Sequence, residues 1–436
     1  QQLLRPRPRR RMTRRLAAAL ALGLTLAASS GTPGLAQRLP PPQLTMTPLK
    51  VSDGASAPVY GSTLFGVSFP DADTGYAVGA YHSIFKTADG GATWTRRDNP
   101  LPTREPRKGL AEDPSGQAYT AVSFSDRDHG VAVSAIGRVV VTADAGDTWT
   151  VRPTPAPASV GAVFPQNIPP SSWSFNGVSF TDPDHGFVVG HLGLILSTAD
   201  GGATWAYRGN PRYGDLVDVK FVDEFHGQIV GRNSGRPDAI SYTTIGTNDA
   251  GDSWQQNMAG KPGDGVSPLN MQGVAVTAPM HAVAVGDFGR IFVTFDEGKT
   301  WRNRRNGTNE SLTDVAFADR RRGVAVGGIN FQGDLRGVVL ATNDGGESWT
   351  SFPQPDVGYF TSVTFASPAT AFAVGCTDTT REGDNVCDAA AVKIDFPELD
   401  PSIEEPVSSG GSRLPLYLLG AAGLVAGAGL LLARRR

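Results

Sequence analysis

Six aspartates recur in one short motif, Thr-x-Asp-x-Gly-x-Thr/Ser-Trp, and they are the first candidates for chemistry in this chain. The motif occurs at Thr87–Trp94, Thr142–Trp149, Thr198–Trp205, Thr247–Trp254, Thr294–Trp301 and Thr342–Trp349. A repeated carboxylate could act as a general acid or bind calcium. Here, however, each carboxylate can accept hydrogen bonds from the backbone of its own turn, and the glycine suits a turn that a Cβ would oppose. We therefore expect a structural role for Asp89, Asp144, Asp200, Asp249, Asp296 and Asp344, and for Trp94, Trp149, Trp205, Trp254, Trp301 and Trp349, which end the motifs and pack against the strands beside them.

Four histidines first suggest a metal cluster: His129, His185, His226 and His281. They occupy the same position in four copies of one repeated turn. Equivalent positions in different repeats lie too far apart to share an ion at bond lengths of ~2 Å. We predict no metal site and no other cofactor.

Cys376 and Cys387 are the only cysteines in the chain. They lie in one loop of the last repeat, and their spacing is not that of a Cys-x-x-Cys redox motif. For an exported chain we expect a disulfide that closes a hairpin-like insertion.

Basic residues cluster in the irregular segments between the repeats. Without the seven Arg of residues 1–36 and the three at the C-terminus, the chain has 29 Lys and Arg against 42 Asp and Glu, a net charge of −13. Such an acidic body is a poor general binder of nucleic acid. The clusters suit an acidic protein surface instead, because guanidinium groups bind carboxylates with directional contacts. The candidate partner-binding residues are Arg104, Arg107, Lys108, Arg232, Arg236, Arg304, Arg305 and Arg336. The candidate aromatic anchors beside them are Phe164, Trp173, Phe331, Tyr359 and Phe360. An ordinary solvated surface remains the alternative.

The elements that position these residues are repeated β-strands. A second signature, which begins with Gly66–Phe69 and ends at Val78-Gly79 in its first copy, occurs seven times. In the first repeat, alternating residues predict strands over 65–69, 76–80, 83–87 and 93–97. Seven repeats of about 50 residues, with 53 Gly and 32 Pro in the chain, predict an all-β fold, a seven-bladed β-propeller of four-stranded antiparallel blades. The seventh repeat stops after its third strand, so Thr45–Ser52 or Ala57–Tyr60 should close the ring. A linear solenoid is the competing architecture.

The two faces of such a disc should differ. The A–B and C–D turns, where A to D are the strands of a blade from the centre outward, emerge on one face, and these turns are short and uniform. The B–C and D–A connections emerge on the other face, and every long or irregular insertion falls there. Binding residues concentrate in such loops on a rigid scaffold.

The two ends of the chain predict export and membrane attachment. Residues 1–36, with Met12 as the expected start, have the charged, apolar and small-residue parts of a signal peptide. Residues 37–59 form a linker and closing strand, 60–396 the propeller and 397–413 a second linker. Residues 414–433 carry no charge and are long enough for a transmembrane helix, and the Arg cluster 434–436 places that end in the cytoplasm. We expect an extracytoplasmic, membrane-anchored monomer.

The eight-residue motif matches the Asp-box, or bacterial neuraminidase repeat, which is structural in the families that carry it. Its pairing with V-x-F-x-D-x-x-x-G-x-A-V-G resembles the photosystem II stability/assembly factor-like family over residues 60–396. The resemblance implies a non-enzymatic seven-bladed propeller whose Arg-rich patch contacts membrane-protein assembly intermediates. The segment from Gly410-Gly411 onward also resembles a Gly-Gly C-terminal sorting tail, which implies removal of the helix by a rhomboid-type protease.

The alternative function is that of a sialidase or another glycoside hydrolase, because these enzymes share the Asp-box. A sialidase requires an Arg triad and a Tyr/Glu pair, and the Arg-Ile-Pro motif that usually precedes the first box does not occur. Other glycosidases require two converging carboxylates. Asp215, Asp218, Glu310 and Asp314 begin inner strands without a catalytic motif. We therefore predict a binding protein with no catalytic residues.

Overall fold

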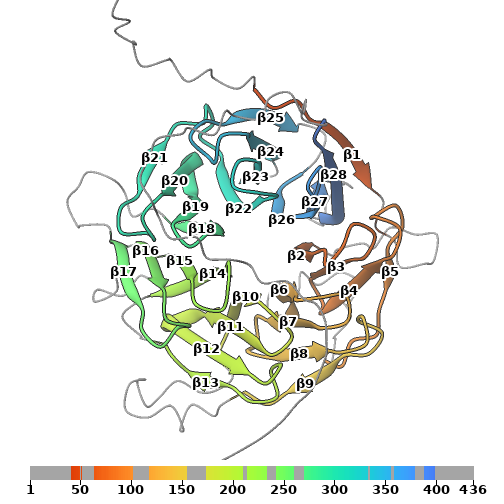
Figure 1. Cartoon of the computed structure of the whole chain (residues 1–436). Helices are drawn as coiled ribbons and strands as arrows, with labels where there is room; N and C mark the ends of the chain where they lie inside the picture. The colour runs from red at the N-terminus through yellow and green to blue at the C-terminus, as the bar shows by residue number, and fades with distance from the viewer. Residues whose placement is uncertain are drawn as a thin grey trace, which may run out of the picture.

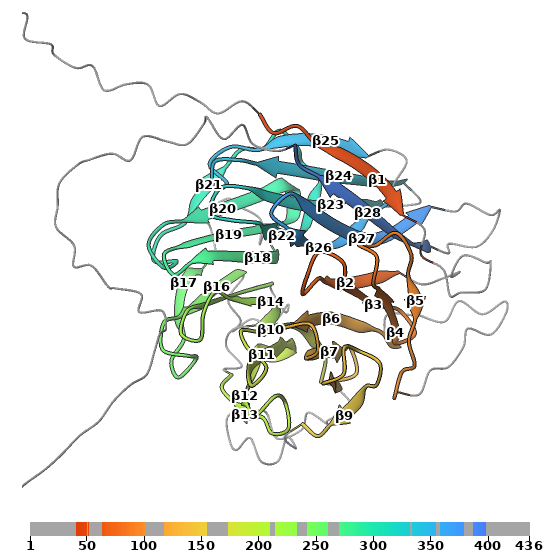
Figure 2. The same cartoon turned by 45° about the vertical axis from the view of Figure 1, so that its right-hand side comes forward.

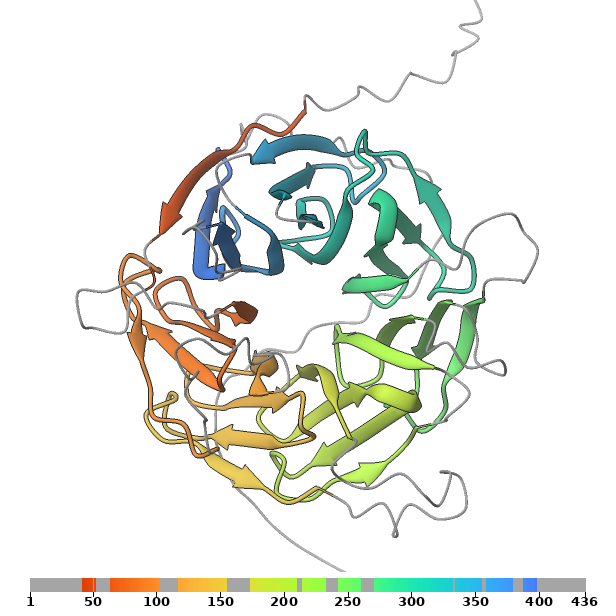
Figure 3. The same cartoon turned by 180° about the vertical axis from the view of Figure 1, so that it is seen from behind.

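The computed structural model describes residues 41–49, 51, 63–101, 117–154, 173–209, 214–232, 242–259, 270–331, 334–354, 358–378 and 387–397. These residues form seven four-stranded antiparallel sheets that surround a central channel (Figure 1). The seven-bladed propeller that the repeats predict is confirmed, and the open solenoid is excluded because the ring closes (Figure 3).

The strands of each blade follow the chain outward from the centre. Blade 1 consists of β2 (Leu64–Ser68), β3 (Gly75–Gly79), β4 (Ser83–Thr87) and β5 (Thr95–Arg96). Blade 2 consists of β6 (Tyr119–Phe124), β7 (Gly130–Ser134), β8 (Val139–Thr142) and β9 (Thr150–Arg152). Blade 3 consists of β10 (Phe175–Phe180), β11 (His185–Gly190), β12 (Leu194–Ala199) and β13 (Ala206–Tyr207). Blade 4 consists of β14 (Asp215–Phe221), β15 (Gly227–Arg232), β16 (Tyr242–Thr247) and β17 (Gln255–Ala259). Blade 5 consists of β18 (Met271–Ala278), β19 (His281–Gly286), β20 (Arg290–Thr294) and β21 (Arg302–Arg304). Blade 6 consists of β22 (Ser311–Phe317), β23 (Gly323–Phe331), β24 (Asp334–Thr342) and β25 (Thr350–Gln354).

Blade 7 is closed by a strand from the other end of the chain. It contains β26 (Phe360–Ser367), β27 (Thr370–Asp378) and β28 (Cys387–Asp395), and β1 (Thr45–Leu49) pairs with β28 in antiparallel register. In Figure 2, β1 runs along the outer edge of this blade. At the channel, the Thr361 hydroxyl donates a hydrogen bond of 2.6 Å to the Leu64 carbonyl of blade 1. The ring is therefore closed at both its rim and its centre.

Each Asp-box is a turn that the side chains of its own motif hold together. In blade 2, Asp144 accepts hydrogen bonds from the Thr142 hydroxyl (2.8 Å), the Thr148 amide (2.9 Å) and the Thr148 hydroxyl (2.6 Å). These bonds, led by that of the Thr148 hydroxyl, lower the pKa of Asp144 to about 2. The same bonds recur in the other five boxes, for example around Asp89 and Asp296. The carboxylates are thus committed to the scaffold.

The fifth residue of five of the boxes also lies close to the preceding blade. Gly146 has φ +73°, and a Cβ at this position would lie 2.6 Å from the Tyr76 ring of blade 1. The Tyr76 hydroxyl donates a hydrogen bond of 2.6 Å to the carbonyl of Ala145 in the same box. The Asp-box is therefore a joint between blades as well as a turn within one.

Several expectations concern residues outside the described ones: the signal peptide, the linker 397–413 beyond its first residue, the helix 414–433 and the Arg cluster. Among the described residues, no helix has the length and apolar character needed to cross a membrane.

Candidate functional site

The described connections of the propeller place two kinds of structure on opposite faces of the disc. Because the strands of each blade are antiparallel and in chain order, the A–B turns and the Asp-boxes share one face, which we call the Asp-box face. The B–C and D–A connections share the other, which we call the loop face. The short 3-10 turns η4 (His191–Gly193) and η6 (Asp287–Gly289) lie in B–C connections on the loop face.

Half of the candidate partner-binding residues lie outside the described part of the chain: Arg104, Arg107, Lys108 and Arg236. The other half are described: Arg232, Arg304, Arg305 and Arg336. All four belong to B–C or D–A segments or to the strand ends that lead into them, and Arg305 and Arg336 are exposed.

Three charged or aromatic side chains from different blades influence one another electrostatically on the loop face. Arg232 ends β15, Asp287 begins η6, and Tyr359 precedes β26. Burial raises the pKa of Tyr359 to about 12, with a further increase from Asp287 and an opposing effect from Arg232. Asp287 also accepts hydrogen bonds from Asn270 (2.8 Å) and Gln272 (3.1 Å), which fix it in place. The predicted cation Arg232 therefore acts electrostatically on the predicted anchor Tyr359.

A second hollow on the loop face lies over blade 5. Its volume is about 710 Å³, and its wall includes Phe288, Arg290, Arg304 and Arg305. Phe288 is 61% exposed and has φ +57°, a backbone conformation that is strained for a residue other than glycine. Arg304 also donates a hydrogen bond of 2.7 Å to the Glu347 carboxylate of blade 6, so one nitrogen of its guanidinium group is already paired within the chain. Arg305 is the exposed cation of this hollow.

Two of the predicted anchors belong to the core instead. Trp173 is 5% exposed and Phe360 is 0% exposed. Trp173 packs over Gly137 of the preceding blade, and Phe360 starts the inner strand of blade 7. The prediction that they anchor a partner is wrong, because neither ring reaches the surface. Phe164 lies outside the described residues.

Cys376 lies near the C-terminal end of β27 and is disulfide-bonded. Three of the four histidines pair with an aspartate of their own turn; for example, Nδ1 of His129 lies 2.9 Å from Asp126. In the part of the chain that the structure describes, no cluster of three or more His, Cys, Asp or Glu residues could hold a metal ion.

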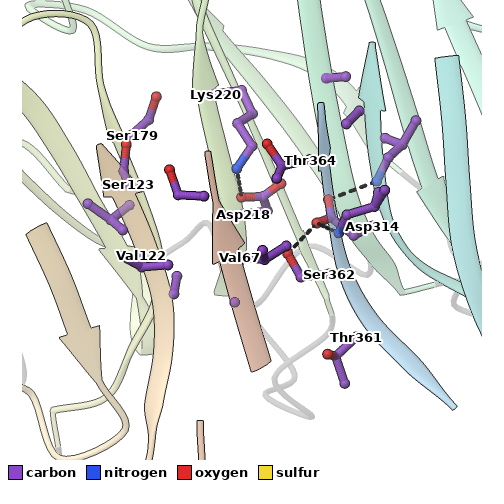
Figure 4. A pocket seen from close by; sticks show the side chains of 18 of the residues that line it. Val67, Val122, Ser123, Ser179, Asp218, Lys220, Asp314, Thr361, Ser362 and Thr364 are labelled. Carbon is purple, nitrogen blue, oxygen red and sulfur yellow. Dashed lines mark hydrogen bonds and ion pairs between the residues drawn. The ribbon is translucent and has the colours of Figure 1, made fainter. Parts of the chain in front are cut away.

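The central channel has a volume of about 530 Å³ and is lined by the seven inner strands (Figure 4). Most of its polar side chains join neighbouring blades. The Ser68 hydroxyl, for example, accepts a hydrogen bond from the Phe124 amide of blade 2 (3.1 Å), and Ser123 and Ser179 do the same in the next two seams. These seam contacts join residues about 40 to 60 positions apart and so leave no local sequence signal, although the three serines hold the same position in their inner strands.

The charged residues among the channel's lining side chains come from blades 4 and 6: Asp218, Lys220 and Asp314. Lys220 Nζ lies 3.3 Å from Asp218 Oδ1 (Figure 4). Burial alone would lower the pKa of Lys220. The negative charges of Asp218 and Asp314 have the larger combined effect, so the pKa of Lys220 lies above its ordinary value. Burial, together with the charge of Asp218, raises the pKa of Asp314 to about 6 despite the opposing effect of Lys220.

A buried carboxyl with a raised pKa beside a second carboxylate is also found in glycosidases, so the surroundings of this pair are informative. Asp218 accepts hydrogen bonds from the Val219 and Val274 amides. Asp314 accepts them from the Val315 and Val363 amides and from the Ser362 hydroxyl. Each carboxylate thus binds the backbone of its own strand and of the next blade, which is a structural use.

Comparison with known proteins agrees with this architecture. A family model described as photosynthesis system II assembly factor YCF48 matches residues 166–304. The chloroplast photosystem II stability/assembly factor HCF136 of Oryza sativa subsp. japonica is 34% identical over 127 residues, which are 28% of this chain and 27% of the relative. The photosystem II assembly lipoprotein Ycf48 of Synechococcus sp. (strain CC9902) is 32% identical over 147 residues, which are 33% of this chain and 38% of the relative. The matched segment thus spans well under half of these relatives.

Solved structures share the fold over most of the propeller. A structure of YCF48 bound to D1 peptide has a TM-score of 0.54 at 17% identity and covers 81% of this chain and 96% of that one. YCF48 from Cyanidioschyzon merolae has a TM-score of 0.53 at 18% identity, with coverage of 80% and 98%. The GH74 enzyme of Niastella koreensis has a TM-score of 0.51 at 13% identity, with coverage of 75% and 54%. At these identities the likeness concerns the fold alone. With the family model and the curated relatives, however, it confirms the predicted resemblance: this propeller is similar to the photosystem II stability/assembly factor-like family, most clearly over residues 166–304.

Proposed function

We propose that this chain is a non-catalytic, extracytoplasmic scaffold that binds a protein partner on its loop face during assembly of a membrane-protein complex. The signal peptide and the helix 414–433 would place the propeller outside the cytoplasm and hold it at the membrane. The photosystem II assembly proteins that it resembles support a role in assembly, and a YCF48 structure with a D1 peptide supports a peptide segment as the element recognised.

The observation that carries the proposal is a hollow on the loop face in which arginines lie beside an exposed aromatic ring. Arg305 and Arg290 border the hollow beside Phe288, and Arg232 acts electrostatically on Tyr359, which lines the channel. Binding energy in protein interfaces concentrates in aromatic and Arg residues. Acidic side chains of a partner would pair with these cations, while the exposed ring would lose its contact with water.

Site-specific crosslinking in native membranes tests the proposal. A photo-reactive residue at position 305 should give one dominant product with a membrane-protein subunit. The same residue at position 147, on the Asp-box face, should not. Asp147 is a suitable control because its side chain is 62% exposed. Equal yields from both positions would contradict a loop-face site.

Charge reversal gives a second readout on the same partner. We expect Arg305→Glu to reduce the crosslinked product at least tenfold, and Lys299→Glu on the Asp-box face, where the side chain is 63% exposed, to leave it unchanged. The enzyme alternative makes a different prediction. It would be favoured if the purified chain hydrolysed a glycoside and if both the Asp218→Asn and the Asp314→Asn variants lost this activity.

A further inference from the structure

In five of the blade-to-blade seams, a large side chain fills the space beside the next blade's Asp-box. In three of them the filler is an aromatic ring that stacks on the phenylalanine near the end of the next inner strand. Tyr76 stacks on Phe124 with ring centroids 3.7 Å apart. Phe187 on Phe221 and Phe372 on Phe69 both have centroids 4.2 Å apart.

In two other seams the filler is polar. Gln228 of blade 4 donates a hydrogen bond of 3.2 Å to the Glu297 carbonyl in the next Asp-box. His281 of blade 5 places Nε2 3.0 Å from the equivalent carbonyl, that of Gly345. Tyr76 reaches the equivalent carbonyl in its own seam, so these residues serve the same purpose.

The seam between blades 2 and 3 lacks such a filler. The residue equivalent to Tyr76 is Val131, as both follow the glycine that begins the second strand. Phe180, the counterpart of Phe124, has an edge contact with Trp205 (centroids 6.3 Å apart, 81°), but no ring among the described residues stacks on it. A cavity of about 220 Å³ lies here, lined by Val131 and Phe180 together with Arg152 and His129.

The same seam also lacks the carboxylate that pairs with an arginine across three other seams. Arg97, Arg208 and Arg304 hold the same strand position as Arg152 in other blades. They pair across their seams with Asp147 (3.7 Å), Asp252 (3.2 Å) and Glu347 (2.7 Å) of the next Asp-box. In blade 3 this box position is Ala203.

Arg152 is therefore left without an acid. Its Nε is buried without a hydrogen-bond partner in the described part of the chain, as are those of Arg97 and Arg304, but Arg152 also lacks the ion pair across the seam that those two arginines make. A buried polar group without a partner is costly, so a ligand that supplies an acceptor gains this interaction on binding. Two acidic residues also line the cavity: Asp184 is exposed to water, and the carboxylate of Asp200 is held by Thr198 and Thr204 of its own box.

We propose that this cavity binds an aromatic carboxylate, whose ring stacks on Phe180 while its carboxylate pairs with Arg152. The ligand would replace the ring and the acid that neighbouring seams provide internally. The space is sufficient, because a cavity of about 150 Å³ accepts a benzene ring. This site lies between blades at the Asp-box face and is independent of the loop-face proposal.

Binding of phenylacetate to the purified full-length chain in detergent, followed by NMR titration, tests the inference. We expect saturable binding of phenylacetate, and affinities at least tenfold lower for acetate, which lacks the ring, and for benzyl alcohol, which lacks the charge. N-acetyl-Gly-Phe and its amide distinguish the source of the carboxylate. If the free acid binds as well as phenylacetate and the amide does not, the C-terminal residue of a protein chain fits. If phenylacetate alone binds, the ligand is a small molecule.

Two variants supply the missing groups from within. Val131→Phe adds the ring and Ala203→Asp adds the acid, and each should lower phenylacetate affinity at least tenfold while raising the melting temperature. Ala92→Asp changes the equivalent box position of blade 1 and should leave the affinity unchanged. Absence of phenylacetate binding, or unchanged affinity in both Val131→Phe and Ala203→Asp, would overturn the inference.

Discussion

At the scale of single residues, the unusual feature of this propeller is the charge in its channel. At the inner-strand position of Lys220, the other six blades carry small residues such as Ser68 and Ala275. Lys220 keeps 41% of its side chain exposed to the channel and lies beside Asp218. We infer that it offsets part of the charge of two carboxylates that hold the backbone of neighbouring blades together.

Asp314 gives a prediction about pH. Its pKa, raised by burial to about 6, lies above the value of 3.8 expected when the chain is unfolded. Between these values the folded state binds more protons than the unfolded state, so this group adds stability as the pH falls from about 6 to about 4. The free energy of unfolding of the wild type, relative to Asp314→Asn, should therefore rise by on the order of 2 kcal/mol across that range.

Urea unfolding of both proteins at pH 4, 5, 6 and 7 measures this difference. Ser179→Ala, which changes an uncharged residue of the channel lining, is the control and should show no such trend relative to the wild type. A difference between the wild type and Asp314→Asn that stays constant with pH would contradict the assignment.

The sequence located the structural residues better than the binding residues, for a physical reason. The Asp-box is local: Asp144 binds groups at most four residues away, so its role can be read from spacing alone. The partners of Asp314 include Val363, 49 residues further along the chain. Trp173 was misassigned for the same reason, since the glycine that it covers belongs to the preceding blade.

At the scale of elements, strand positions followed closely from the repeats, because period-two alternation and Asp/Gly turns are both local signals. The second strand, predicted at 76–80, is β3 (Gly75–Gly79), and the third, predicted at 83–87, is β4 (Ser83–Thr87). The fourth strand is shorter than predicted: β5 covers Thr95–Arg96 because Trp94 still belongs to the Asp-box turn and packs in the core.

The joint between boxes and blades gives a prediction with a matched control. Gly146 and Gly307 both have positive φ, +73° and +80°, but a Cβ on Gly146 would meet the Tyr76 ring, whereas one on Gly307 would meet nothing within 4 Å. Alanine at either site should lose about 1 kcal/mol through backbone strain. Gly146→Ala should lose a further 1–3 kcal/mol, because the ring must move in a packed seam.

Chemical denaturation of the two variants checks this difference. Equal losses would mean that the Asp-box glycine serves the turn alone and not the contact between blades. Combining Gly146→Ala with Tyr76→Ala should recover part of the additional loss if the ring is the obstacle.

At the scale of the whole molecule, stability depends on one strand that arrives from the far end of the chain. The five residues of β1 supply the outer strand of blade 7, and Leu49 packs with Phe372 and Val374 at the junction with blade 1. Without β1, β28 would become an unpaired edge, which is prone to pair with another chain.

We expect a variant that lacks residues 41–51 to melt at least 10 °C lower and to form dimers or larger species, which light scattering detects. A synthetic peptide of residues 41–51, added in excess, should restore both properties, because it can pair with β28 as the native strand does. The same peptide with Leu49→Asp should not restore them, since a charge would enter the apolar junction. An unchanged melting temperature after the deletion would mean that the contacts at the channel, including that of Thr361 with Leu64, close the ring without the strand at its rim.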